Sequence, residues 1–335
     1  MERSKQERRT RKRIGIMFLL LLLMMVAGIM GGAVKVSLHD FWNLFAGNEI
    51  TAAGRIILYI RLPRMIGAVI AGMGLSVAGA IIQTILNNPL AGPNIIGVNS
   101  GAGFAVVLCS ALLPKAYQIL PFAAFGGAFL TVMFVYYLGK KTGASQMTLI
   151  LAGVAIGSLL NGATDALYTF QEESLLASTS FRIGGLSGIN TSVLTYAGAV
   201  VIISLILVLL FHNELEVLSL GEETARTLGL SVSAYRFLFL ALAAALSGAA
   251  VSFAGLLGFV GLIIPHIARM LVGEESKYFI SASAILGALF LLVCDYIART
   301  WFAPYELPVG IILSFVGAPF FVWLLFHRRK RRQNA

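Results

Sequence analysis

The sequence has little charge for its length. Of its 335 residues only 12% are Asp, Glu, Lys or Arg, whereas 58% are apolar. Soluble domains average about a quarter charged residues, so this composition excludes an ordinary soluble protein. The apolar runs are on the order of 20 residues long, the length of a membrane-spanning helix, and they lack the alternation over about ten residues that marks a membrane β-barrel strand. The sequence therefore predicts an all-α integral membrane protein.

Side chains that carry chemistry are also scarce. The two cysteines, Cys109 and Cys294, lie in separate apolar runs, there is no CxxC motif, and the histidines lack the spacing of a zinc site. His266, in IIPHIAR, has no histidine or cysteine placed to share a metal with it, so we assign it a structural role. We expect no metal site and no cofactor bound by this chain.

Two kinds of enzyme are excluded by what is missing. The phosphate-binding pattern GxxxxGK[ST] is absent, so this chain does not itself hydrolyse ATP. A membrane-embedded enzyme would need acids or histidines clustered near one face, and the sequence has no such cluster. We therefore expect a protein without catalytic residues.

The basic residues are concentrated at the two ends of the chain. The formal net charge is +10, but 12 of the 25 Lys and Arg residues lie in two clusters, seven in residues 3–13 and five in residues 328–332. Such clusters fit the excess of Lys and Arg on the cytoplasmic side of membrane proteins better than a nucleic-acid surface. We therefore expect cytoplasmic termini at residues 1–13 and 327–335, a single transmembrane domain at residues 14–326, and no nucleic-acid partner.

Because both termini are expected on one side, the number of spans must be even. The first apolar run is longer than the roughly 7–15 apolar residues of a cleavable signal, so it is expected to stay as the first span. Residues 237–270 are nearly unbroken, but glycines at 255–261 divide them into a seventh span and a short, broken eighth span that ends at Pro265. That division gives ten spans, at residues 14–34, 62–86, 95–113, 120–138, 147–170, 193–211, 235–254, 256–270, 279–301 and 307–326. Small residues, as in GAVIAGMGLSVAGA at 67–80, predict close helix packing.

A polar segment, residues 212–236, interrupts the apolar pattern and falls on the cytoplasmic side of the ten-span arrangement. It reads HNELEVLSLGEETARTLGLSVSAYR and holds four of the 15 acidic residues. Within it, Gly221 and Gly229 bracket EETARTL, in which two glutamates precede Arg226, the charge order that suits the dipole of a short helix. From the residues alone this segment is either a plain connector or a docking surface for another protein.

Three arginines stand at the outer ends of spans, against the inside bias of the other cations. Arg61 and Arg64 flank Pro63 in RLPR, and Arg299 lies near the end of the ninth span. They either bind lipid headgroups or, with Arg61 and Arg64 as a rigid outward pair, meet carboxylates on a docking protein. Asp295, one helical turn before Arg299, is expected to form an intrahelical ion pair with it.

Polar residues at the inner ends and in the middle of the spans are candidates for a transport pathway. NNPLAGPN, residues 87–94, must form a fixed irregular turn, which serves either as structure or as a gate. The fifth span begins nearby in space with SQMT, residues 145–148. Asp165 lies within that span, where a carboxylate is costly, so it should face the bundle interior or a wet cavity. A structural hydrogen bond, a place on the pathway and proton coupling are all open to it.

Six segments together resemble the FecCD-type permeases of ABC importers for ferric siderophores, cobalamin and haem. They are IRLPR (60–64), NNPLAGPNIIGVNSGAG (87–103), LAGVAIG (151–157), LGEETARTLGL (220–230), GFVGLIIPHIAR (258–269) and ELPVGIILSFVGAPFF (306–321). They come in the family's order and extend over nearly the whole chain beyond the first helix.

The resemblance implies an assembly in the cytoplasmic membrane of a prokaryote. Two permease subunits, either copies or relatives, surround a pathway, two cytoplasmic ATPases bind ATP and Mg²⁺, and an extracytoplasmic binding protein or lipoprotein delivers the ligand. Cytoplasmic coupling helices pass the closure of the ATPases to the ten spans, which open alternately to each side. This chain would then be a mechanical element embedded in membrane lipid. A ferric siderophore is the commonest ligand in the family, with cobalamin and haem as alternatives.

The resemblance also implies roles for individual residues. Those that match the family's coupling helix are Glu222, Glu223, Ala225, Arg226, Leu228 and Gly229. Arg61, Arg64 and Arg299 match outer arginines that meet acidic residues of the binding protein. Asn88 and Leu90 match a cytoplasmic gate turn, whereas Gln146 and Met147 fall where small hydroxyl residues form the other gate, so this position departs from the family pattern. The rival hypothesis is a secondary transporter driven by an ion gradient, with Asp165 as its coupling residue.

Overall fold

The computed structural model describes residues 2–32, 51–113, 115–142 and 146–333. Within these ranges the chain forms helices and turns, with no strand. The prediction of an all-α protein is therefore confirmed.

Each of the ten predicted spans overlaps one α-helix of the structure. In chain order these are α1 (Glu2–Met30), α4 (Leu62–Ile85), α5 (Val98–Leu112), α6 (Leu120–Lys141), α7 (Gln146–Phe170), α9 (Thr191–Leu210), α12 (Val232–Ala254), α13 (Val260–Val272), α14 (Ser276–Thr300) and α15 (Val309–Gln333). Seven of the regions are long and apolar enough to cross a membrane, whereas α5, α13 and the apolar part of α15 are shorter. A polytopic helical membrane protein is thus confirmed, and the number of ten spans stays a prediction.

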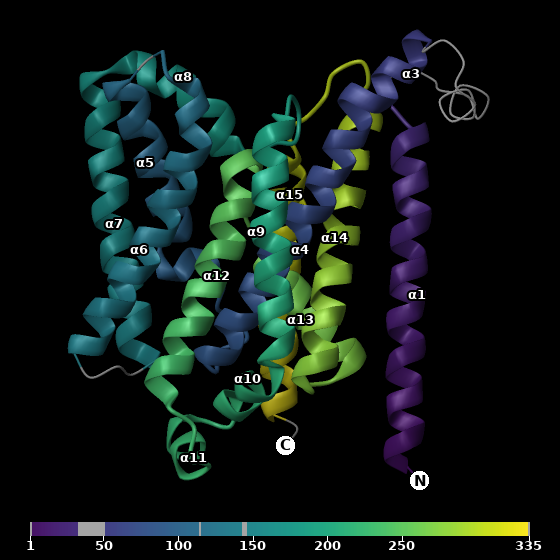
Figure 1. Ribbon diagram of the computed structural model, residues 1–335, viewed down its shortest axis with the longest axis vertical. Coiled ribbons are helices and arrows are strands. Elements are labelled where there is room, and N and C mark those ends of the chain that lie inside the picture. Colours follow the sequence, from purple (N-terminus) through teal and green to yellow (C-terminus); the bar gives the residue numbers. More distant parts are fainter. Residues whose placement is uncertain (1, 33–50, 114, 143–145, 334–335) are drawn as a thin grey trace.

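Shorter elements connect these helices. They are α3 (Ala52–Ile56), the π-helical η1 (Ile57–Arg61), η2 (Pro93–Ile96), η3 (Tyr117–Ile119), α8 (Glu172–Ile183), α10 (His212–Ser219) and α11 (Glu222–Thr227). α3 and η1 run directly into α4, and α8, which the sequence analysis did not anticipate, follows α7. α10 and α11 make up most of the polar segment and lie at the end of the molecule opposite α3 and α8 (Figure 1). We call these the α11 end and the α3 end.

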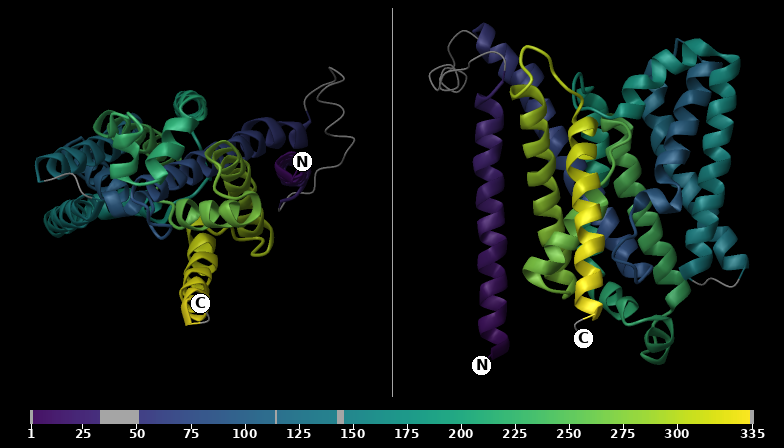
Figure 2. Two further views of the ribbon diagram at one scale, coloured as in Figure 1. Left: turned by 90° about the horizontal axis from the view of Figure 1, so that it is seen from below. Right: turned by 180° about the vertical axis from the view of Figure 1, so that it is seen from behind.

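The helices form an elongated bundle with α4, α12 and α14 near its centre. α4 packs against both α12 and α14 along its length. α6 and α7 lie at one side of the bundle, and α1 lies at the other, beside α14 (Figure 1). Seen from below, α15 stands off from the remaining helices (Figure 2). Because α1 and α7 lie at the two sides of the bundle, most of their surface is uncovered: only 17% of an apolar 18-residue stretch of each helix is buried.

Close backbone contact between glycines holds the centre of the bundle together. A Cβ atom on Gly72 of α4 would lie 2.2 Å from the carbonyl oxygen of Gly287 on α14. A Cβ atom on Gly79, two turns further along α4, would lie 1.8 Å from the carbonyl oxygen of Gly261 on α13. Only glycine fits at such crossings, so the predicted packing through small residues is confirmed.

The seventh and eighth spans divide at the predicted glycines. α12 ends before Gly255, whose φ of 71° lies in the left-handed region, and α13 begins at Val260. The prediction that the eighth span ends at Pro265 is wrong, because α13 continues through this proline to Val272. Pro265 is the sixth residue of α13, so its missing N–H deprives a single carbonyl, that of Gly261, of its helical partner. That carbonyl is the one packed against α4.

The first and the last described helices, α1 and α15, each have one end at the α11 end (Figures 1 and 2). α1 begins there and α15 finishes there, as an even number of crossings requires. The clustering of Lys and Arg in the terminal segments predicts that the α11 end faces the cytoplasm.

Candidate functional site

The polar segment is built around α11, which two glycines bracket as predicted. Gly221 has a φ of 100° and Gly229 a φ of 82°, a region of backbone space in which any side chain is strained. The first turn of α11 carries Glu222 and Glu223, and its last turn carries Arg226. These charges interact favourably with the helix dipole, as expected. The two glycines fix the directions in which the chain enters and leaves a helix of only six residues.

Glu222 fastens α11 to the start of α12. Its Oε1 accepts a hydrogen bond from Nη2 of Arg226 at 2.7 Å, and its Oε2 accepts one from Nη2 of Arg236 at 2.9 Å. The Arg236 side chain is only 5% exposed, so this ion pair is shielded from water on one side. The hydrogen bond from Arg236 lowers the pKa of the Glu222 carboxyl below its usual value. Ala225, on the inner face of α11, is fully buried.

The opposite face of α11 is exposed. Leu220, just before the helix, is 58% exposed and Leu228, just after it, is 62% exposed, and Glu223, Arg226 and Gly229 are exposed as well. Apolar side chains rimmed by charges are typical of protein contact surfaces. The six predicted coupling residues therefore divide into two groups: Glu222 and Ala225 hold the helix in place, and the other four are accessible to a partner.

α10 precedes α11 and packs into the bundle. Leu215 and Leu218 are buried, and Oε2 of Glu216 accepts a hydrogen bond at 3.2 Å from the backbone N–H of Ser276, the first residue of α14. The sequence analysis treated residues 212–236 as one segment and missed this separate helix. The spacing of its two buried leucines, three residues apart, is the signal that could have revealed it.

The turn NNPLAGPN is irregular and fixed, as predicted. Oδ1 of Asn88 accepts a hydrogen bond from the backbone N–H of Leu90 at 3.0 Å, a local turn motif that asparagine favours. The backbone N–H of Asn88 donates to the carbonyl of Gln83, and that of Ala91 donates to the carbonyl of Asn88. Leu90 lines a cavity of about 200 Å³ together with Phe259. We call residues 87–91 the gate turn.

The two predicted gate segments lie side by side. With the Asn87 amide oriented by its hydrogen-bond partners, its oxygen accepts from Nε2 of Gln146 at 3.2 Å, and its nitrogen donates to the carbonyl oxygens of Thr84 and Ser219 at 3.2 and 3.1 Å. Met147, the next residue of α7, is exposed. The structure thus brings Asn88, Leu90 and Gln146 into one region at the α11 end, and it adds Asn87, which the sequence analysis did not single out.

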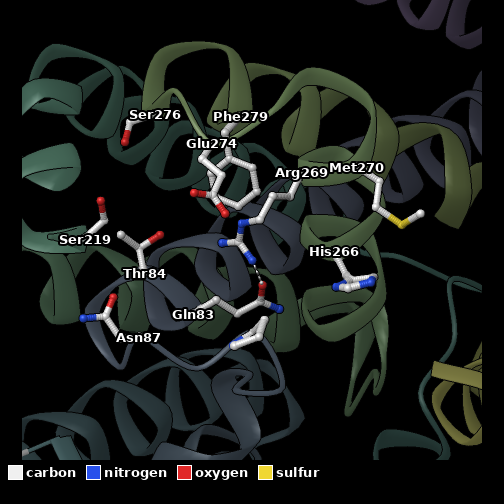
Figure 3. A pocket seen from close by; sticks show the side chains of 11 residues that line it. Gln83, Thr84, Asn87, Ser219, His266, Arg269, Met270, Glu274, Ser276 and Phe279 are labelled. Carbon is white, nitrogen blue, oxygen red and sulfur yellow. Dashed lines mark hydrogen bonds between the residues drawn. The ribbon is translucent and has the colours of Figure 1, made fainter. Parts of the chain in front are cut away.

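A polar cavity of about 320 Å³ opens beside the gate turn. Figure 3 shows Thr84, Asn87 and Ser219 on one side of it and His266 and Met270 on the other. Nη1 of Arg269 lies 3.4 Å from Oε1 of Gln83, and its guanidinium lies over the ring of Phe279 at 4.7 Å. Among the described residues, no three His, Cys, Asp or Glu side chains are grouped in a way that could hold a metal ion.

Asp165 does not face the interior of this chain. We expected Asp165 in the bundle interior or in a wet cavity; the first expectation is wrong, because Asp165 is exposed on α7, and the second stays a prediction. The physical reason is the position of α7 at one side of the bundle, where it packs against α5, α6 and α8 and leaves its other face open. Whether Asp165 lines the pathway therefore depends on what covers α7 in the assembly.

The three outer arginines are buried, so the prediction of an outward pair is wrong in its geometry. Arg61, Arg64 and Arg299 are 4%, 6% and 5% exposed. Arg61 donates to the carbonyls of Ile29 and Met30 at 2.6 and 3.0 Å, and Arg299 donates to those of Gly28 and Gly31. These carbonyls end α1 and have no helical partner of their own, which is why they attract the guanidinium groups.

Arg64 binds carboxylates within the chain. Its Nε lies 2.9 Å from Oδ1 of Asp295, and its Nη1 lies 2.5 Å from Oε2 of Glu306. The expected pair of Asp295 and Arg299 is confirmed, with 3.5 Å between Oδ2 and Nε, but Asp295 serves Arg64 as well. The docking role of the three arginines stays a prediction.

The chain resembles known transport proteins over nearly its whole length. Residues 19–327 match the model of the FecCD transport family. The chain belongs to this family. The Fe(3+)-citrate import system permease protein YfmE of Bacillus subtilis is 33% identical to it over 330 residues, which cover 98% of this chain and 99% of that protein. The hemin transport system permease protein HmuU of Yersinia pestis is 34% identical over 327 residues, which cover 96% and 97%.

A solved structure agrees with this assignment. An inward-facing conformation of a metal-chelate type ABC transporter has a TM-score of 0.83 and 28% identity, and the match covers 95% of this chain and 99% of that one. The resemblance drawn from six sequence segments is therefore confirmed. This FecCD chain is a permease subunit of an ABC transporter and not an enzyme; it acts with a permease partner and with ATPase subunits that hydrolyse ATP.

Proposed function

We propose that this FecCD permease imports a ferric siderophore across the cytoplasmic membrane of a prokaryote by alternating access. The names of two relatives, one for iron citrate and one for hemin, support an iron chelate as the ligand. Haem and cobalamin are the alternative ligands, because permease proteins named for hemin transport and for cobalamin import are similar to this chain.

The observation that carries the proposal is the construction of α11. Its inner face is fixed by Ala225 and by the ion pair of Glu222 with Arg236, while Leu228 stands exposed among charged residues. A short rigid helix flanked by the exposed apolar side chains of Leu220 and Leu228 suits a cleft on another protein, and it can transmit a displacement without bending. We assign this surface to the ATPase, with one ATPase for each of two permease subunits.

The uncovered face of α7 supports a second permease subunit. Asp165 and the apolar residues Leu151 and Leu159 are exposed there. A second subunit over this face would place Asp165 beside a pathway between the two subunits, where water can solvate its carboxylate. In that position it can contact ligand without carrying protons, so no ion gradient is required.

The α3 end is assigned to the extracytoplasmic binding protein. Arg64 is buried there, but the Glu306 side chain that covers it is 44% exposed. A carboxylate of the binding protein reaches Arg64 once Glu306 moves aside, so docking proceeds by exchange of one carboxylate for another.

Reconstitution in liposomes with the cognate ATPase and binding protein tests the function. ATP hydrolysis should rise when the binding protein carries a ferric siderophore, and labelled siderophore should accumulate inside. Stimulation by haem or cobalamin alone would replace the ligand but keep the mechanism. Uptake driven by an ion gradient without ATP, with loss of uptake in Asp165→Asn, would refute the ABC mechanism in favour of a secondary transporter.

A further inference from the structure

Asn87 joins three elements that the proposed mechanism must move together. Its side chain contacts the carbonyl of Ser219 at the end of α10, the side chain of Gln146 at the start of α7, and the carbonyl of Thr84 in the last turn of α4. Thr84, Gln146 and Ser219 are far apart from one another in the sequence. The amide therefore connects the polar segment to both gate segments through direct hydrogen bonds.

α10 is placed to carry movement from α11 to this amide. The backbone N–H of Gly221 donates to the carbonyl of Leu218 at 3.3 Å, so the chain turns tightly from α10 into α11. α10 is anchored in the bundle by Leu215 and Leu218 and at the start of α14 by Glu216. A displacement of α11 toward the bundle therefore shifts the Ser219 carbonyl.

The gate turn is stiff enough to pass that shift on. Asn88 follows Asn87 directly, and its backbone N–H is held by the carbonyl of Gln83 at 3.0 Å. Asn88 in turn holds the backbone of Leu90 and of Ala91. The cavity behind Leu90 and the polar cavity beside Asn87 (Figure 3) leave room for the turn to move as a unit.

The chemistry at this position requires an asparagine. The backbone of Asn87 has a φ of 43°, which asparagine and glycine tolerate better than other residues. One amide supplies both the donor that two carbonyls need and the acceptor that Gln146 needs. Aspartate keeps the shape but loses the donor, and glycine keeps the backbone but loses the side chain.

We propose that Asn87 is a positioning residue that transmits movement of α10 to the gate turn and to α7, and so couples ATP hydrolysis to opening of the pathway. This inference rests on the proposed function, because it needs an ATPase that acts on α11.

Reconstituted complexes with wild-type permease, Asn87→Gly and Asn87→Asp test the inference. The measured quantity is the number of ligand molecules imported per ATP hydrolysed. In both variants this ratio should fall about fivefold, the lower end of usual coupling free energies, while ATP hydrolysis and thermal stability stay within about twofold and a few degrees of wild type. A purely structural role would lower hydrolysis, stability and uptake together.

Two matched controls isolate the amide. Ser219→Ala removes a hydroxyl but keeps the carbonyl that Asn87 contacts, and Asn94→Ala changes a second asparagine of the same segment, for whose side chain no hydrogen bond is seen among the described residues. Both should keep the wild-type ratio. If Asn87→Gly fails to assemble, Gln146→Ala tests the same link from the other side and should lower the ratio too.

The outcomes separate this inference from the function on which it rests. A wild-type complex that does not couple ATP hydrolysis to uptake would overturn the proposed function. A coupled wild-type complex with an unchanged ratio in Asn87→Gly or in Gln146→Ala would overturn only the role of Asn87. An additive loss in the double variant Asn87→Gly, Gln146→Ala would also count against it, because residues of one link should not add.

Discussion

Arg64 on α4 and Asp295 on α14 form an ion pair that is almost completely buried, with 2.9 Å between Nε and Oδ1 and side chains 7% and 1% exposed. Asp295 also lies 3.5 Å from the guanidinium of Arg299, so one carboxylate pairs with two buried cations. A buried charge without its partner is far more destabilising than an exposed one. The centre of the α3 end therefore depends on Asp295.

Replacing Asp295 by Asn should destabilise the permease by about 3–5 kcal/mol, since two guanidinium groups lose their shared carboxylate. The measurement is thermal unfolding of the purified permease in detergent. Glu306→Gln serves as the control, because Glu306 is partly exposed and its loss should matter by only about 1 kcal/mol or less. Equal stability of Asp295→Asn and wild type would show that water reaches this cluster.

Glu306→Gln should also tighten docking of the binding protein, by about two- to tenfold. Glu306 covers Arg64 with 2.5 Å between Oε2 and Nη1, so it competes with any incoming carboxylate. Binding would be measured on permease in nanodiscs at low and at high salt, because charge pairing weakens as salt rises. Glu274→Gln makes the same charge change at the α11 end and should have no effect. Weaker docking of Glu306→Gln would mean that Glu306, rather than Arg64, contacts the partner.

The sequence predicts the helices of this fold well but not the neighbours of its charged residues. Apolar runs of span length and the glycines around α11 are local signals, and each is confirmed. The burial of Arg61 is not local, because its partners are carbonyl oxygens at the end of α1, some 30 residues earlier. A pattern that places a cation at the end of a span does not reveal whether another helix covers it.

The same limit explains why Asn87 was missed. Its neighbours Asn88 and Leu90 match a family pattern, whereas the importance of Asn87 arises from contacts with Ser219 and Gln146, which only folding brings together. The prediction for Pro265 was wrong for a related reason. A local rule placed the end of a helix at this proline, but α13 continues through it, and the carbonyl that loses its hydrogen bond packs against α4. Tertiary contacts decided each of these cases.

Gly229→Ala should uncouple ATP hydrolysis from uptake although it adds a single methyl group. No atom lies within 4 Å of the added Cβ, so the effect comes from the backbone φ of 82°, at which a side chain costs roughly 1–2 kcal/mol. The strain is relieved by turning α11 away from its present direction. Uptake per ATP is the measurement, with Gly126→Ala in α6 as the control, because that site is equally open and its φ is not positive. Normal coupling in Gly229→Ala would refute the role of the bracketing glycines.

The ion pair between Glu222 of α11 and Arg236 of α12 should depend on pH. Hydrogen bonds from Arg236 and Arg226 lower the pKa of Glu222 in the folded protein below its usual 4.5. A carboxyl whose pKa is lowered by folding stabilises the fold above its unfolded pKa and loses that contribution as the pH falls through the lowered value. Hydrogen–deuterium exchange of α11, corrected for intrinsic rates, should therefore stay slow from pH 7 to about pH 5 and quicken only below about pH 4.5.

Glu222→Gln should quicken exchange in α11 already at pH 7 and remove this pH dependence, since the neutral amide cannot form the ion pair with Arg236. In Glu223→Gln, a change of the exposed neighbouring residue, hydrogen–deuterium exchange of α11 should match wild type, because the ion pairs seen for α11 in the described residues involve Glu222. Loss of the ion pair between Glu222 and Arg236 should also lower uptake per ATP, because a loosely held α11 moves without displacing α10. Slow exchange in Glu222→Gln at neutral pH would instead place the anchoring of α11 in Ala225 and its apolar contacts alone.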